Sequence, residues 1–113
     1  MRKHQIQDAA FEVATQVRAV EDSIDMALAE MAELQARVMR ANAVAHAGYA
    51  TVHPALEQLA AAVTGLVGAR GSVVDCHVAL AEAKGKVPGL RTVSFGEPTE
   101  CPKTGFADLR VVA

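Results

Sequence analysis

Apolar residues recur at alternating intervals of four and three along the first half of the chain. These intervals keep the apolar side chains on one side of an α-helix. No proline or glycine occurs between Arg2 and Ala47. The pattern therefore predicts one long helix over residues 4–47, with Gly48 as its left-handed C-cap. The apolar seam of this helix consists of Ile6, Ala10, Val13, Val17, Val20, Ile24, Ala27, Met31, Leu34, Val38, Ala41 and Ala45.

A second helix is predicted over residues 54–84. Pro54 suits its first turn, where the missing N–H group has no helical partner to lose. Three glycines then recur at intervals of three, at Gly65, Gly68 and Gly71. They indicate either a strip on which another helix approaches closely or a kink near residues 68–71. The expected buried stripe is Leu56, Ala60, Val63, Val67, Val74, Val78 and Ala81.

Residues 87–113 lose the helical period and contain three of the four prolines. This segment is predicted to be an extended C-terminal arm, with Phe95 and Phe106 as its apolar anchors. The chain is thus expected to divide into a helical hairpin, residues 1–86, and the arm.

The short segment between the two predicted helices favours an antiparallel hairpin. Pairing across a centre near residue 50 would bring Ala27 close to Val74 and leave residues before about Gln16 without a partner in the second helix. The predicted class is therefore all-α, a long antiparallel hairpin assembled into a four-helix or larger bundle. The residues expected to form the interface are Ile6, Phe11, Val13, Val17, Gly65, Gly68 and Gly71, with Phe95 and Phe106 on the arm.

Composition and charge limit the classes of partner that the protein can bind. Lysine and arginine number 11 against 13 acidic residues, for a net charge of -2, which argues against binding nucleic acid by phosphate neutralisation. The longest charge-free apolar run, residues 58–69, is shorter than the roughly 20 residues that span a bilayer. No apolar leader follows the first residues, so a cytoplasmic protein without a membrane partner is expected. Cys76 and Cys101 lack metal or redox spacing and are expected to be free thiols, Cys76 within the core.

Two groups of polar residues are candidate sites. His46, His53 and Glu57 flank the predicted turn and could form a metal site, or they could be solvated turn residues. Asp75, Cys76 and His77 contain the residue types of a catalytic relay, but successive helical residues point about 100° apart and cannot form one. No enzyme activity and no cofactor are therefore expected.

The acidic residues between Ala19 and Ala36 have no base among them. They form either a solvated face or a docking surface for a basic partner. Taken together, the patterns predict a structural or protein–protein interaction protein, an adaptor, scaffold or assembly component that associates with itself and with another protein. The alternative is a helical bundle that binds a small ligand or a metal through the histidines at the hairpin turn.

Overall fold

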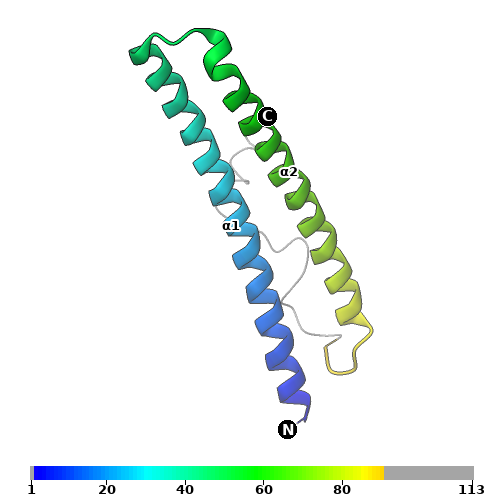
Figure 1. The fold of residues 1–113 in the computed structure, drawn as a ribbon. Helices are drawn as coiled ribbons and strands as arrows, with labels where there is room; N and C mark the ends of the chain where they lie inside the picture. The colour runs from blue at the N-terminus through cyan, green and yellow to red at the C-terminus, as the bar shows by residue number, and fades with distance from the viewer. Residues whose placement is uncertain (1, 91–113) are drawn as a thin grey trace, which may run out of the picture. The chain divides into compact units, whose positions relative to one another are not determined.

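The computed structural model describes residues 2–90 and consists of two long helices that form a hairpin. Helix α1 is Arg2–Ala45 and helix α2 is Tyr49–Gly85, and residues 2–90 contain no strand (Figure 1). The all-α hairpin predicted from the sequence is confirmed. The predicted arm beyond Leu90, with Phe95 and Phe106, lies outside the described residues.

The chain divides into two compact units. The tip unit is Val17–Val73, which contains the turn and the parts of both helices next to it. The terminal unit joins the chain up to Gln16 with the chain from Val74 onward. Each unit holds one segment of each helix, so each is described by itself below.

In the tip unit, α1 ends at a different residue from the one predicted. Helix α1 ends at Ala45, and His46 takes the left-handed conformation with a φ of 53°. Histidine is among the non-glycine residues that adopt this conformation more readily than most. Gly48, the predicted C-cap, has no positive φ, and the prediction for that residue was wrong.

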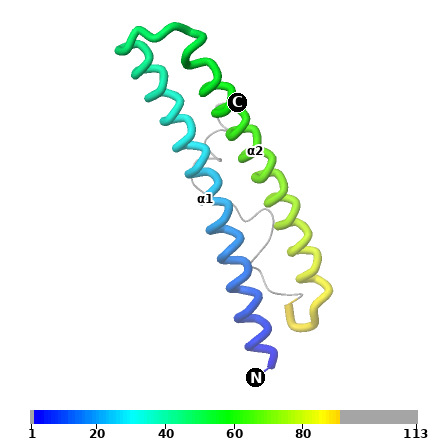
Figure 2. Tube along the Cα trace, viewed as in Figure 1, coloured from blue at the N-terminus to red at the C-terminus, as the bar shows by residue number. Residues whose placement is uncertain are grey.

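Helix α2 begins five residues earlier than predicted, at Tyr49, directly after the short turn (Figure 2). The Thr51 N–H donates a hydrogen bond to the Gly48 carbonyl at 3.1 Å, which closes the first turn of backbone. Pro54 consequently lies inside the helix, where its ring removes one backbone hydrogen bond. The helix then continues unbroken through Gly65, Gly68 and Gly71.

An ion pair shows the register of the tip unit. The Arg70 Nε donates to the Asp25 Oδ1 at 2.7 Å, so these two residues lie side by side, whereas the sequence paired Ala27 with Val74. The earlier start of α2 and the compact turn account for this shift. Val67, which the sequence placed in the buried stripe, is 55% exposed. The half-buried positions are Val17, Glu21, Ile24, Ala27, Leu28, Met31, Ala36, Val38, Asn42 and Ala47 before the second helix, and Val52, Leu56, Leu59, Val63, Leu66 and Val73 on α2.

In the terminal unit the chain folds back onto the start of α1. After Gly85, three backbone hydrogen bonds between residues three apart turn residues 83–90. The Gln7 Nε2 then donates to the Gly89 carbonyl at 3.0 Å, and Gly89 has a φ of 90°, which favours glycine. The sequence predicted no partner in the second helix for the first residues, and this contact to them comes from the turn after α2.

Little of the hairpin is buried. Among the described residues the buried ones are Leu90, which is 5% exposed, and His77, which is 7% exposed. No described side chain is fully buried. Cys76, expected in the core, is an exposed free thiol on α2. Two paired helices therefore leave most of their apolar side chains in contact with solvent.

We expect Leu90→Ala to lower the free energy of unfolding by about 2–3 kcal/mol, because it removes a buried leucine side chain. Urea unfolding followed by circular dichroism measures this change. Leu80→Ala is the control, since Leu80 is 38% exposed and its loss should cost less than about 1 kcal/mol. Equal effects of the two variants would contradict a packing role for Leu90.

Candidate interaction surface

One side of α1 in the tip unit carries an apolar stripe that is exposed except at the half-buried Ala27. Val20, Ala27, Leu34 and Ala41 recur every seven residues, and Leu34 is 45% exposed. Three of the four precede by one residue a half-buried position of α1, at Glu21, Leu28 and Asn42. The stripe therefore lies beside the contact with α2.

Helix α2 carries a matching stripe of small residues. Ala55, Ala62 and Ala69 are exposed, and each precedes a position that faces α1, namely Leu56, Val63 and Arg70. The two helices face each other and run in opposite directions. The residue before each facing position therefore turns to the same side on both helices.

These residues define the flank face, which comprises Val20, Ala27, Leu34 and Ala41 of α1 with Ala55, Ala62 and Ala69 of α2. No position of this face is charged. Antiparallel helix pairs in water usually have charged or polar residues at such positions, next to the contact. The flank face is therefore an apolar surface that the hairpin itself does not cover.

The opposite side of the same unit carries charge. Asp25 lies there and binds Arg70, and both side chains are about half exposed. The hydrogen bond to Asp25, followed by the charge of that carboxylate, raises the pKa of the Arg70 guanidinium above its ordinary value. Like any arginine, Arg70 is a cation over the whole accessible pH range.

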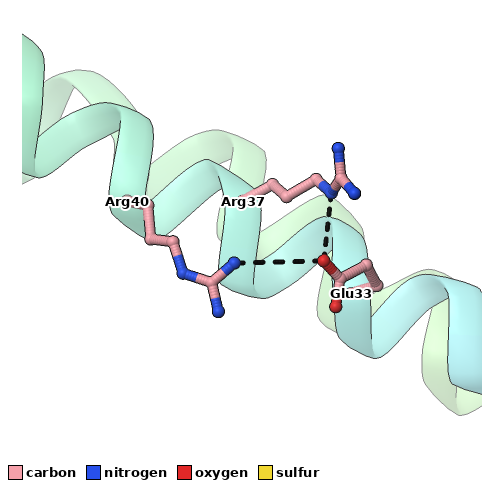
Figure 3. Close-up of polar contacts among 3 residues, drawn as sticks. All are labelled: Glu33, Arg37 and Arg40. Carbon is pink, nitrogen blue, oxygen red and sulfur yellow. Dashed lines mark hydrogen bonds and ion pairs between the residues drawn. The ribbon is translucent and has the colours of Figure 1, made fainter.

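The surface of α1 beyond the contact is also polar. The Glu33 carboxylate accepts a hydrogen bond from the Arg37 Nε at 3.0 Å and lies 3.9 Å from an Arg40 nitrogen (Figure 3). Because α1 ends at Ala45, its last turn contains no basic residue. The two arginines lie before that turn and pair with Glu33.

The structure places the predicted interface residues in different environments. Phe11 and Val13 are 57% and 48% exposed, whereas Ile6 and Val17 are half-buried. The three predicted glycines are exposed, and a Cβ atom added at any of them would meet nothing within 4 Å. Each of these glycines is turned about 60° around the helix from the one before it.

The turn histidines come together only in part. The His53 Nε2 lies 3.5 Å from the Glu57 Oε1, and both side chains are about two-thirds exposed. Within residues 2–90, no three or more histidine, cysteine, aspartate or glutamate side chains are placed to hold a metal ion. His46 therefore does not join the other two in the arrangement observed.

Helix α2 is long and apolar enough to cross a membrane by length and composition, and none of its most apolar window is buried. A single helix of this kind is weak evidence for a membrane span, because core helices of soluble proteins have the same composition. Its charge-free run is short, and Arg70 at the end of that run binds an acid of α1.

No protein-family model, no curated protein and no solved structure matches the chain. The candidate surface therefore rests on the geometry alone.

We expect the ion pair between Asp25 and Arg70 to contribute less than about 1 kcal/mol to stability, since both side chains are well solvated. A double-mutant cycle with Asp25→Asn and Arg70→Met, measured by urea unfolding, gives the coupling energy. The coupling should fall further in 1 M NaCl, where screening is strong. Glu33→Gln with Arg37→Met is the matched cycle within one helix, and a coupling well above it would show a larger role for the cross-helix pair.

Proposed function

We propose that this chain is a structural protein that acts through protein–protein contacts, a helical hairpin that associates with itself to form a larger helical bundle. The observation that supports this proposal is the mismatch between apolar content and burial. Leu90 is the buried apolar residue among residues 2–90, whereas the large apolar side chains Phe11, Leu34 and Val67 are each at least 45% exposed.

Exposed apolar surface of this extent is typical of proteins whose surface is completed by a partner. A single exposed leucine or valine is ordinary, but a contiguous apolar patch marks an interaction site. The exposed apolar side chains also recur at multiples of the seven-residue period of packed helices, as at Val20, Leu34 and Ala41. Helices of another hairpin would fit such a period, and a globular partner would not require it.

A role as an adaptor or assembly component follows from the same surfaces. The outer side of α1 is charged and solvated, with Glu33 bound by Arg37 and Arg40. It is therefore the surface on which a second, polar partner would be accommodated once the apolar sides are covered. Contact between Glu57 and His53 alone does not favour the metal-binding alternative, and that alternative is not proposed.

We expect the full chain to form a discrete oligomer in solution, because burial of the exposed stripes would stabilise it by about 25 cal/mol per Å² of apolar surface. Light scattering on a sizing column measures the mass. Leu34→Glu should reduce the oligomer to a monomer. The control is Met26→Glu, since Met26 is 68% exposed on the outer side of α1. A monomeric parent chain, or an unchanged mass for Leu34→Glu, would contradict the proposal.

A further inference from the structure

We propose that residues 91–113 cover one apolar side of the terminal unit of their own molecule, with Phe95 in contact with Phe11. The inference goes beyond the proposed function, because it assigns an occupant within the chain to apolar surface of the terminal unit. The apolar surface of the tip unit is then the part that is left for other hairpins. Every described residue that carries the argument belongs to the terminal unit.

The surface to be covered is defined by residues that follow the inner positions of each helix. Ala10 of α1 is half-buried and His77 of α2 is buried. Phe11 and Val78 come directly after these two residues, so they turn to the same side of a pair of opposed helices. Val74 lies one turn before Val78, and all three of these apolar side chains are exposed. We call this surface, comprising Phe11, Val74 and Val78, the Phe11 side.

The chain after α2 already lies beside this surface. The Gln7 Nε2 donates a hydrogen bond to the Gly89 carbonyl at 3.0 Å, and a Cβ atom built on Gly89 would meet the Lys3 side chain at 3.5 Å. Lys3, Gln7 and Phe11 are spaced by four, so they form one row along α1. Phe11 therefore follows Gln7 by about 6 Å along the helix axis. Leu90, the last described residue, is buried at this place.

The length of the chain beyond Leu90 fits the surface. Residues 91–113 number 23 and can extend over about 76 Å, whereas the part of α1 up to Gln16 is about 24 Å long. The segment is therefore long enough to cross the whole Phe11 side. Phe95 follows Leu90 by five residues and can lie no more than about 17 Å from it. This tether keeps Phe95 in the neighbourhood of Phe11.

The side chains of this segment suit an apolar surface. Two of the three phenylalanines of the chain are Phe95 and Phe106, and the third is Phe11. Aromatic pairs attract each other more strongly than their buried area alone accounts for. Val93 and Phe95 are two residues apart, so an extended backbone would place both on one face. The segment thus brings a ring and a branched side chain to the place where Phe11 is exposed.

Charge favours this segment over a second copy of the same side. Asp8 and Glu82 follow the half-buried Gln7 and Ala81, so they turn to the Phe11 side, and both are exposed. Two copies packed through this side would bring these acids toward one another. The first charged residue after Leu90 is instead Arg91, whose charge is opposite. A short tether also gives the segment a local concentration in the millimolar range.

A disulfide between the two phenylalanine positions tests the contact. In a parent chain with Cys76→Ser and Cys101→Ser, we would introduce Phe11→Cys together with Phe95→Cys and oxidise under native conditions. We expect both thiols to be lost while the chain remains monomeric on a denaturing, non-reducing gel. Circular dichroism confirms that the variant is helical before it is oxidised.

The matched control is Val13→Cys with Phe95→Cys. Val13 is also exposed and lies two residues from Phe11, but it is turned about 160° away from it around α1. Internal oxidation of the control should be at least tenfold slower. A segment without a preferred side would oxidise with both positions at similar rates.

A double-mutant cycle tests the same contact without cysteines. Phe11→Ala and Phe95→Ala, singly and together in the full chain, are compared by urea unfolding. Because an aromatic pair is lost only once, the two changes should be coupled by about fivefold in the unfolding equilibrium constant. Val13→Ala with Phe95→Ala is the matched cycle and should show less than about twofold coupling.

The outcomes separate this inference from the proposed function. An internal disulfide that prefers Phe11, together with the coupling, supports the contact within one chain. A covalent dimer from the first pair would mean that copies exchange this segment. That result, equal rates for the two pairs or a cycle without coupling would overturn the inference. The proposed function is decided separately, by the mass of the parent chain, and either proposal can fail while the other stands.

Discussion

Two packed helices can cover only one side of each other, and this limit governs the rest of the structure. A helix that is apolar at two positions of each heptad is satisfied by one neighbour. In α1 one of the two apolar heptad positions, that of Val20, Ala27 and Leu34, lies beside the contact, and α2 has no charge between Gln58 and Ala69 on any side. The hairpin therefore leaves apolar side chains exposed, whatever the details of its contact.

The sequence was sufficient to predict the two helices, but it was not sufficient to predict which of their residues face each other. The long interval without proline or glycine predicted α1 to within two residues at each end, because helix formation depends mainly on local preference and periodicity. The seam chosen for α1 contained both facing residues, such as Ile24, and exposed ones, such as Val20. Periodicity alone could not separate them, because two residues four apart, such as Val20 and Ile24, differ by only about 40° around the helix.

The register between α1 and α2 depended on the turn that joins them, and that turn depended on the conformation of His46. Glycine is the usual left-handed residue at a helix end, so Gly48 was the natural choice, but His46 takes that conformation. Starting α2 at Tyr49 then moved every later residue relative to α1 and brought Arg70 to Asp25. The small-residue stripe at Ala55, Ala62 and Ala69 was missed for this reason. Its seven-residue spacing was the signal that could have indicated it.

The hydrogen bond from Gln7 to Gly89 has a mechanical consequence. It joins the beginning of α1 to the chain just after α2, so the two ends of the described chain leave from the same unit. Force applied between those ends would load this contact first and then open the helix pair one turn after another. Such peeling requires far less force than sliding two helices past each other. A hairpin of this kind would resist load only where neighbouring copies hold its two helices together.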